Sequence, residues 1–449
     1  MSIMYKPFRA LLLISGLVIG SQQLQAQQLS NSPYSRFGVG DMVHGTSSVR
    51  STGMGQVGVA NGSAALINDL NPALLYYNNS VTFEAAVASE LKRLSDKNTS
   101  QVDGTANLGY LSLALPLSRR WTTSLGLRPY SRVNYTTIST APVSGSEATV
   151  TSYNEYNGTG GINEVYFAHG VRIANGLTAG VAGSYLFGTI DRQESTILVD
   201  REDSTSALQK TLIHTTSKYT GLMFKGGLHY RKKLGDKASL GIGGTYTTKA
   251  NLSTDRQVAQ ERRLLDESVI SSLVTDSLEG YTTLPKMIQV GLSFDNNKNW
   301  SVGADYTQTK GSEYRGFSLA KEGGRQELGD GYRVGIGSEI TPDAGSVSSY
   351  FKRVTYRFGG YYGNTQINAI TTGNTTPSAH DLKDMALTFG FSLPLGRGVR
   401  PPDYTQALLN TSFTVGQLEA ENTGLKEQYL RVNLGITFNN RWFIKRKFD

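Results

Sequence analysis

Residues that could perform nucleophilic or acid–base chemistry are sparse in this sequence. Its five histidines are far apart: His44, His169, His214, His229 and His380. Hydrolysis by a serine or aspartate mechanism needs such a residue held beside a histidine. None of the five is flanked by a motif that marks a nucleophile. The sequence therefore predicts no catalytic residue, and we expect that the protein is not an enzyme.

Metal chemistry is also not indicated. The 449 residues contain no cysteine, which removes thiolate ligands, disulfide frameworks and the acylated cysteine of a lipoprotein. The aspartates and glutamates do not follow the ligand spacing of calcium loops. We expect no metal site and no cofactor.

One glycine motif resembles a nucleotide-binding signature. Residues 53–58 (GMGQVG) match the G-x-G-x-x-G pattern of dinucleotide-binding folds. No apolar strand precedes them, because residues 45–52 are mostly polar. The acidic residue that follows, Asp69, falls short of the expected spacing of ~20 residues. We reject the nucleotide interpretation; these glycines favour an irregular segment that packs tightly.

The basic residues lie at alternate positions of short segments. A formal net charge of +8 could indicate a nucleic-acid partner. A nucleic-acid site would, however, gather lysines and arginines in a run or a helical stripe, and neither occurs here. We therefore expect no nucleic-acid partner and ask which elements could place single charges at every second residue.

Those elements are strands. From Val81 onward the sequence repeats an alternating segment followed by a turn. In the last segment Leu430 and Val432 take one face, and Arg431 and Asn433 take the other. The fourteen expected strands are 80–91, 105–116, 121–136, 161–173, 177–195, 211–232, 238–252, 283–296, 299–312, 331–341, 350–363, 383–396, 406–417 and 427–440.

The strands indicate a membrane barrel rather than a soluble sandwich. Segments of about ten residues or more fit a tilted bilayer crossing, whereas sandwich strands average about five or six. Long and short connections alternate along the chain, and aromatic residues gather at strand ends. The expected fold is an all-β, fourteen-stranded antiparallel transmembrane barrel in the outer membrane. An even strand number would leave both termini in the periplasm.

In such a barrel the charged residues must face the lumen, because a charge on the lipid face costs about 2–4 kcal/mol near the midplane. We expect Arg333, Arg353 and Arg357 to pair with Asp305 and Glu339. Two roles stay open for these charges: structural pairs, or a ladder that selects substrate. The arginines expected to be lumenal are Arg128, Arg132, Arg172, Arg333, Arg353 and Arg357.

Two segments outside the strands divide the chain. Lys6 and Arg9 precede an apolar core at residues 10–20, which is too short for the ~20 residues of a transmembrane helix. We expect residues 1–26 to be a cleaved signal peptide. Residues 27–79, rich in glycine, serine and asparagine, would plug a barrel formed by residues 80–449.

One connection has helical composition. In residues 253–282, Val258, Leu265, Val269 and Leu273 fall on one helical stripe. We expect an amphipathic helix at the barrel mouth, which would either line an apolar capture site or only cover its own apolar face.

Residues 47–75 (SSVRSTGMGQVGVANGSAALINDLNPALL) resemble the N-terminal hatch of FadL/TodX-type outer-membrane transporters. The resemblance lies in a G-x-G segment followed by Asn-Pro-Ala before the first strand. Leu284-Pro285 and Gly291 are also similar to that family, and both ends of the mature chain resemble orphan barrels of Bacteroidetes-type bacteria. The matching hatch residues are Gly53, Gly55, Gly58, Asn71, Pro72 and Ala73.

The resemblance implies a hatch-plugged barrel that imports hydrophobic small molecules, of the long-chain fatty acid or aromatic hydrocarbon type. In that family, ligand can leave sideways at a kinked third strand. The third expected strand here contains Gly126 and Pro129, and proline cannot donate to a strand ladder. These two residues are the expected lateral gate. The family's fatty-acid-binding side chains have no counterpart that can be placed in the outer loops.

A second function stays open. FadL-like barrels of Bacteroidetes-type bacteria also serve as non-conducting docking subunits of secretion or outer-membrane assembly complexes, the PorV type among them. The expected partners are therefore outer-membrane lipid, a hydrophobic ligand, the barrel-assembly machinery during biogenesis and, in the docking case, proteins of a secretion complex. Saturable uptake of an apolar probe would favour transport, and a stable set of co-purified proteins would favour docking.

Overall fold

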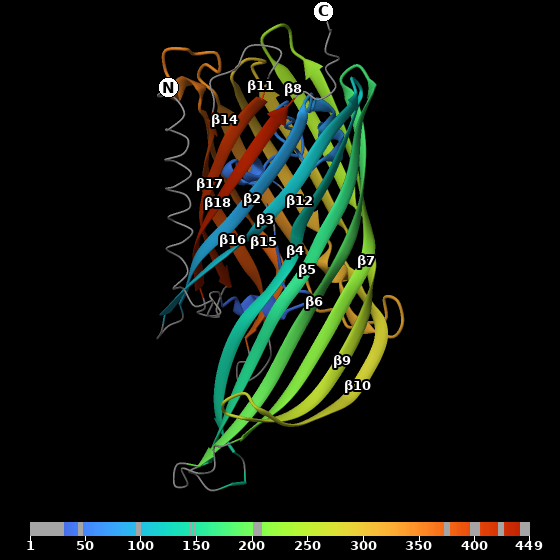
Figure 1. Ribbon diagram of the computed structural model, residues 1–449, viewed down its shortest axis with the longest axis vertical. Helices are drawn as coiled ribbons and strands as arrows, with labels where there is room; N and C mark the ends of the chain where they lie inside the picture. The colour runs from blue at the N-terminus through green and yellow to red at the C-terminus, as the bar shows by residue number, and fades with distance from the viewer. Residues whose placement is uncertain are drawn as a thin grey trace, which may run out of the picture.

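The computed structural model describes residues 31–43, 48–95, 100–143, 145–146, 150–200, 209–371, 378–395, 405–420 and 426–440. The expected signal peptide, His44 and the tail from residue 441 lie outside the described residues. The dominant element is one large antiparallel sheet that curls into a tall barrel (Figure 1).

Fourteen strand crossings form the barrel wall in the described residues, as expected. Of eighteen strands, β1 and β13 are short additions, β8 with β9 makes one crossing, and β10 with β11 makes another. Pairing of β18 with β2, for example Val432 with Ser89, closes the ring. The strands are β1 (Asp41–Met42), β2 (Val81–Ser95), β3 (Ser100–Ser118), β4 (Trp121–Pro142), β5 (Val150–Ala174), β6 (Leu177–Asp200), β7 (Gln209–Lys233), β8 (Ser239–Thr247), β9 (Ala250–Leu264), β10 (Val269–Leu284), β11 (Met287–Asp295), β12 (Trp300–Thr309), β13 (Arg315–Ser318), β14 (Gly331–Ile340), β15 (Thr355–Thr371), β16 (Ser378–Pro394), β17 (Thr405–Ala420) and β18 (Lys426–Asn440).

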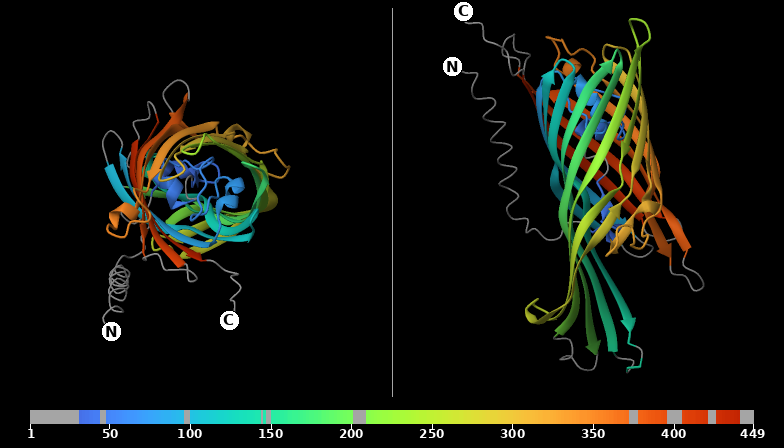
Figure 2. Two further views of the ribbon diagram at one scale, coloured as in Figure 1. Left: turned by 90° about the horizontal axis from the view of Figure 1, so that it is seen from above. Right: turned by 90° about the vertical axis from the view of Figure 1, so that its right-hand side faces the viewer.

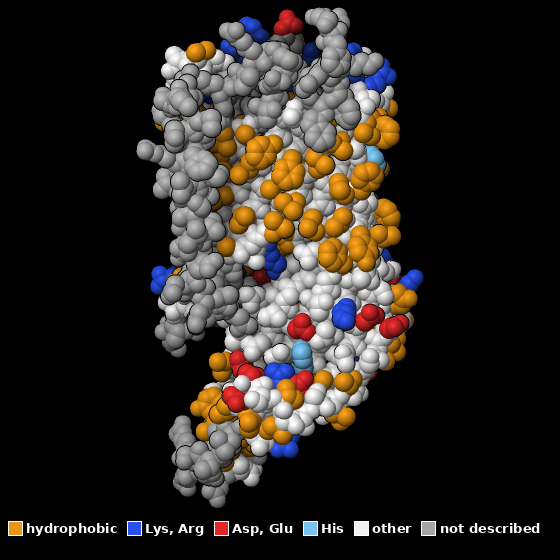
Figure 3. Space-filling model, in the orientation of Figure 1, with side chains coloured by type: hydrophobic (Ala, Val, Ile, Leu, Met, Phe, Trp, Pro, Cys, Tyr) orange, Lys and Arg blue, Asp and Glu red, His pale blue; other side chains and the backbone are white. Residues whose placement is uncertain are grey.

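The wall is apolar outside and mostly small or polar inside, because successive strand residues point to opposite faces. Leu125 is 50 % exposed and Leu292 is 53 % exposed, whereas their neighbours Ser124 and Ser293 are buried. Figure 3 shows the resulting belt of apolar side chains around the upper part of the barrel. An apolar belt of this kind is the surface that a transmembrane barrel presents to lipid.

The N-terminal segment occupies the lumen. Seen along the barrel axis, the blue chain lies inside the ring (Figure 2, left). We call residues 31–43 and 48–79 the hatch. It contains β1 and three short helices: η2 (Pro33–Arg36), α2 (Val49–Gly53) and η3 (Pro72–Tyr77). No helix in the described residues is long and apolar enough to cross a bilayer.

Strands β4, β5, β6, β7, β9 and β10 pair in that order. Their ends continue beyond the barrel at one end as a curved, open sheet (Figure 2, right). We call this sheet the extension; it consists of residues 136–142, 150–158, 192–200, 209–217, 256–264 and 269–280. The opposite end has short turns, such as Asn175-Gly176 between β5 and β6. Several connections that the sequence suggested were long loops are therefore strand continuations.

The expected helix in residues 253–282 is wrong. These residues form most of the β9–β10 hairpin, which pairs with itself and with β7 along its length. The neighbouring strand β7 offers a row of backbone partners that sequence periodicity does not reveal, and β-branched Val258, Val269 and Val274 suit a strand. A single helical stripe was too weak a signal against that pairing.

Candidate functional site

The middle of the hatch is held to the wall by a carboxylate. Asp305 of β12 accepts hydrogen bonds from the backbone N–H of Gly58 at 2.6 Å and of Val59 at 2.8 Å. Asp305 is 6 % exposed, so these charge-assisted bonds form away from water. Gly58, expected as a hatch residue, is thus fixed through its backbone.

A second anchor joins the hatch helix α2 to two neighbouring strands. Glu339 of β14 accepts from Arg50 Nε of the hatch at 3.0 Å and from Arg357 Nε of β15 at 3.1 Å. Arg357 Nη1 also donates to Ser392 Oγ at 2.8 Å. Because both arginines are buried, loss of Glu339 would leave two buried cations without a counter-ion.

A third anchor is Arg128 of β4, which directly follows the last residue of β4 that pairs with β3. Arg128 contacts Asp69 of the hatch at 2.6 Å and Glu164 of β5 at 2.8 Å. Burial raises the pKa of the Asp69 carboxyl to about 6, although the nearby Arg128 guanidinium acts in the opposite direction. Arg128 is therefore a clamp between hatch and wall.

Glycines let the hatch backbone lie directly on the wall. A Cβ atom added to Gly337 would lie 2.1 Å from the carbonyl oxygen of Met54, which is too close for any side chain. Gly55 has a φ of +66°, so the hatch turns there in a conformation that favours glycine. Other wall glycines whose added Cβ would collide with hatch backbone or Asn71 are Gly170, Gly180, Gly227, Gly243, Gly335 and Gly359.

The Asn-Pro-Ala motif forms the first turn of η3. The side chain of Asn71 accepts from the N–H of Ala73 at 3.0 Å and caps the turn. The same amide donates to the carbonyl of Val59 at 2.8 Å and to that of Leu228 on β7 at 3.1 Å. One side chain therefore links η3, the glycine segment and the wall, with Pro72 packed against Gly180 of β6.

The wall is interrupted between β3 and β4. Pairing of these strands runs from Ser118–Trp121 to Leu111–Leu127 and stops there. Beyond this point β4 pairs with β5, with a bulge between Pro129 and Ser131. The N-terminal half of β3 pairs with β2 alone among the described residues. From Arg128 onward the two strands therefore separate.

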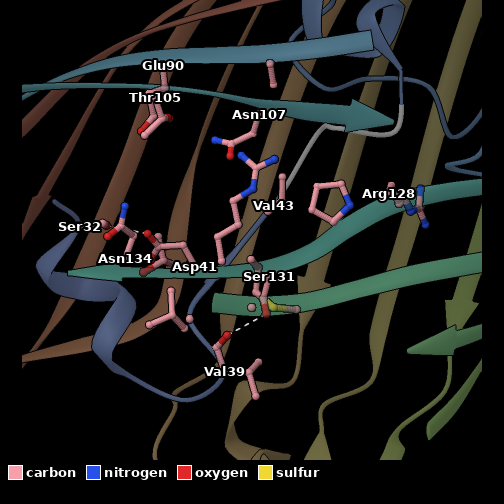
Figure 4. A pocket seen from close by; sticks show the side chains of 18 of the residues that line it. Ser32, Val39, Asp41, Val43, Glu90, Thr105, Asn107, Arg128, Ser131 and Asn134 are labelled. Atoms are coloured by element: carbon pink, nitrogen blue, oxygen red, sulfur yellow. Dashed lines mark hydrogen bonds between the residues drawn. The ribbon is translucent and has the colours of Figure 1, made fainter. Parts of the chain in front are cut away.

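The hatch covers the edge of β4 that β3 leaves open. β1 pairs with Ser131 and Arg132, and the N–H of Val43 donates to the carbonyl of Tyr130 at 3.1 Å. Ser131 Oγ donates to the carbonyl of Val39 at 2.8 Å (Figure 4). Arg132 reaches across the gap and donates to the carbonyl of Leu108 on β3 at 3.0 Å.

A cavity of about 940 Å³ adjoins this gap on the lumen side. Figure 4 looks into it, with Thr105 and Asn107 of β3 and Ser131 and Asn134 of β4 among its lining. One part of the lining is charged and the other is apolar. The charged part includes the buried pair Lys92–Glu427 at 3.0 Å, together with Glu90 and Arg431. The apolar part includes Val39, Val133, Leu284, Tyr314 and Leu328.

The comparison with known families covers almost the entire chain. A family model named BamG matches residues 4–449.

The chain belongs to the BamG family.

No curated protein sequence matches this BamG-family chain. Solved structures do, and they share its fold. The toluene transporter TbuX of Ralstonia pickettii has 15 % identity and a TM-score of 0.54, covering 87 % of this chain and 97 % of its own. A FadL homologue of Pseudomonas aeruginosa has 13 % identity and a TM-score of 0.55, covering 90 % and 99 %. The toluene transporter TodX of Pseudomonas putida has 15 % identity and a TM-score of 0.53, covering 88 % and 98 %. This BamG-family protein has the FadL-like β-barrel fold, as the hatch resemblance implied.

The two expected gate residues differ in position. Pro129 lies just beyond the last β3–β4 pair, beside the bulge. Gly126 lies within the paired part, where an added Cβ would meet the Tyr166 ring at 2.5 Å. Gly126 thus makes room for an inward tyrosine, and Pro129 marks the break. Their role as a lateral gate stays a prediction.

The remaining arginines of this BamG-family barrel have mixed positions. Arg357 pairs with Glu339 as expected. Arg172 contacts Tyr76 Oη of the hatch at 3.3 Å. Arg333 interacts with Asp305 electrostatically and its guanidinium lies 5.8 Å from the Tyr361 ring, while Asp305 accepts hydrogen bonds from hatch amides.

Arg353 does not lie on a strand, contrary to expectation. It ends the short helix η5 (Phe351–Arg353), and β15 begins only at Thr355. Its guanidinium lies 5.3 Å from the Tyr350 ring in the turn between β14 and β15. The turn takes up the residues that alternation alone had assigned to the strand.

Sequence reasoning missed the hatch's own charged residues. Arg50 is the hatch partner of Glu339, and Asp69 is the hatch partner of Arg128. A further wall carboxylate, the buried Glu84 of β2, accepts from the N–H of Ile67 in the hatch at 2.9 Å. The sequence did offer one indication: a charged residue in a plug of small and polar residues would be buried inside the barrel, and a buried charge is stable only when it is paired.

Two of the described histidines have packing roles in this barrel, and His214 lies in the extension, 3.3 Å from Asp191. His229 is buried, and its Nε2 lies 3.1 Å from the carbonyl oxygen of Ala60 in the hatch. His169 lies on the outer face, where the Trp121 indole donates to its Nδ1 at 3.2 Å. Among the described residues no group of three or more His, Asp and Glu side chains is arranged to hold a metal ion.

Proposed function

We propose that this chain is a non-enzymatic docking subunit of the outer-membrane barrel-assembly machinery. The observation that carries the proposal is the BamG family match over residues 4–449, since the family's name is that of the barrel-assembly (Bam) machinery. The machinery would then bind the mature protein stably, in addition to inserting it into the membrane during biogenesis.

Two features of the barrel support a docking role. Three buried polar anchors fix the hatch at Asp305, Glu339 and Arg128, so the lumen at hatch level is filled by a firmly held segment. The extension adds a sheet outside the barrel wall that a channel alone does not need. A filled barrel with a protruding sheet suits a scaffold.

The proposal includes an orientation. Short turns are typical of the periplasmic side of bacterial barrels, and long connections of the outer side. We place the short-turn end, with Gly176 and Gly235, in the periplasm, and the extension outside the cell. The last strand then ends at Asn440 on the periplasmic side, whereas the first described hatch residue, Asn31, lies towards the extension, where its side chain donates to the carbonyl of Thr136.

Co-purification tests the docking role. The tagged full-length protein is extracted with a mild detergent and its partners are identified by mass spectrometry. We expect the central barrel of the assembly machinery to remain bound, and a tagged unrelated barrel from the same membrane to lack it. A BamG-family chain that elutes alone under conditions that keep the machinery intact would contradict the proposal.

A second function has a specific observation in its favour. The β3–β4 break from Arg128 onward adjoins the 940 Å³ cavity, which would give a ligand a route from the lumen to the lipid. With its charged and apolar parts, the cavity suits an amphipathic ligand such as a fatty acid better than a plain hydrocarbon. Saturable uptake of a fluorescent fatty acid by liposomes that contain only this protein would support transport, and uptake equal to that of empty liposomes would exclude it.

A further inference from the structure

One margin of the extension carries an unpaired strand edge. β10 pairs with β9 from Val269 to Leu284. On its other side, the described pairing is limited to Tyr281 and Thr283, which meet β13. Residues 269–280 therefore present free backbone N–H and C=O groups at the margin of the extension (Figure 1). Such an edge can receive another strand.

The composition of this edge differs from that of a protected edge. Residues 269–280 (VISSLVTDSLEG) contain no proline, lysine or arginine, which natural proteins use to block edge pairing. Apolar side chains are exposed along it, with Leu273 at 65 % and Val274 at 50 %. The opposite margin, residues 136–142 of β4, ends in Pro142, and the N–H of its first residue, Thr136, donates to Asn31 Oδ1 of the hatch at 3.1 Å. The β10 margin has no such proline or hatch contact among the described residues; two bulges and two carboxylates lie along it.

Bulges set the length of a segment that this edge can hold. The register with β9 shifts between Val269 and Ser271 and again between Val274 and Asp276. Bulges twist a strand and interrupt its ladder. Two short regular runs remain, residues 271–274 and 276–280, which suit a short extended segment and not a long flat strand.

Charge defines the partner further. Glu279 is exposed, and its described cross-strand partner is the like-charged Asp255 of β9, which has Lys218 of β7 on its other side. The neighbouring carboxylate of Asp276 already has Arg256 at 3.0 Å. A cation from outside the sheet would therefore be favourable beside Glu279.

We propose that the free edge of β10 binds a short, extended, apolar segment of a partner protein by strand addition, with a lysine or arginine of that segment beside Glu279. The inference rests on the proposed docking role and names its surface. A second copy of this chain is a poorer occupant, because two β10 edges would bring acidic strands together.

A defined peptide tests the edge. The probe is a fluorescent peptide of about five residues that alternates valine with threonine around one central lysine, matching the run 276–280. Its binding to the full-length protein in nanodiscs is followed by anisotropy. Leu273→Lys should weaken binding by roughly tenfold or more, because a lysine protects an edge. Ile138→Lys is the matched control, since Ile138 lies on the opposite margin and is also 65 % exposed. A peptide with central proline should not bind. Equal binding to both variants would overturn the proposal.

A charge exchange separates recognition from simple loss of structure. Glu279→Lys should prefer the peptide with a central glutamate over the lysine peptide, reversing the preference of the natural protein. An unreversed preference would overturn the placement of the cation. A detergent-stable dimer that Leu273→Lys dissolves would assign the edge to a second copy and would also overturn the proposal.

Co-purification of the variants distinguishes failure of the edge from failure of the docking role. Loss of the assembly machinery from Leu273→Lys but not from Ile138→Lys supports both. Retention in both variants overturns the edge and leaves the docking role. Absence from the natural protein overturns the docking role, and the peptide measurements then still decide whether the edge receives strands.

Discussion

At the scale of single residues, the hatch depends on a few buried charges more than on its many small side chains. Asp305, Glu339 and Asp69 each join the hatch to a different part of the wall. A buried carboxylate is favourable only while its donors are in place. Substitutions at these positions should therefore act on hatch seating and leave the barrel standing.

Asp305→Ala should loosen the hatch. The substitution leaves two buried N–H groups, those of Gly58 and Val59, without acceptors, at a cost of about 1–3 kcal/mol each. Limited proteolysis of the purified barrel should show faster cleavage in the hatch. Glu322→Ala is the control, because its ion pair with Lys249 is exposed and such surface pairs contribute little to stability. Equal cleavage in both variants would contradict the anchor.

Hatch seating should weaken as pH rises from about 4 to about 6. The pKa of Asp69 is raised from its ordinary value to about 6 in the folded state. The folded protein therefore keeps a proton that the released hatch loses, so the stabilisation is complete below the ordinary pKa and is lost as pH passes the raised one. Asp69→Asn should flatten this dependence, measured as proteolysis rate against pH. A slope that persists in Asp69→Asn would assign it to another group.

At the scale of elements, alternation predicted the wall better than it predicted the ends. Apolar–polar alternation placed all fourteen crossings, because a bilayer outside and a lumen inside impose it on every strand. Alternation did not predict that Arg353 lies in a turn. It also did not predict that residues 253–282 form a hairpin, because a sheet outside the membrane has no apolar solvent on one face. The hatch glycines were visible in the sequence, but the wall glycines that receive them were not, since their contacts join distant segments.

The glycine contacts between hatch and wall predict a second way to unseat the hatch. Gly337→Ala should displace it, because the new methyl would lie 2.1 Å from the carbonyl oxygen of Met54. The strand itself should tolerate alanine. The control is Gly226→Ala, where nothing lies within 4 Å of an added Cβ. Planar-bilayer conductance should rise for Gly337→Ala alone; unchanged conductance together with unchanged protease resistance would refute the tight fit.

The break in β4 predicts the behaviour of a proline variant. Pro129→Val restores a backbone N–H at the position where β3–β4 pairing stops, which should favour extension of the ladder and narrow the opening. Uptake of a fluorescent fatty acid by liposomes should fall several-fold while heat-modifiable migration of the barrel is retained. Undiminished uptake by Pro129→Val would remove Pro129 from the gate.

At the scale of the whole molecule, the two proposed functions use different regions. Transport needs the cavity and the β3–β4 gap, whereas docking by β10 needs only the extension. The gap lies between β3 and β4, whereas the free edge is residues 269–280 of β10, on the margin of the extension opposite β4. One covalent change can therefore test them against each other.

A disulfide between Met42→Cys and Ser131→Cys provides that change. These residues are cross-strand partners of β1 and β4, and the chain contains no other cysteine. The oxidised bond would lock the hatch across the gap, since the Cβ atoms of such neighbours lie about 4.5–5.5 Å apart and need only a small shift to reach the roughly 3.5–4.5 Å of a disulfide. Uptake should stop on oxidation and return on reduction, with co-purified partners unchanged. Loss of partners on oxidation would show that docking also needs hatch movement.

The closure of β18 onto β2 imposes an order of events on biogenesis. The hatch precedes every barrel strand in the sequence, yet it packs on Gly337, Gly359 and Gly390, which belong to strands near the end of the chain. The hatch must therefore wait, unseated, until the ring is nearly complete, and it is enclosed when the seam between first and last strand joins. Such long-range pairing is slow. A chaperone that covers the hatch before the barrel closes would therefore determine the fraction of barrels that fold with the hatch inside.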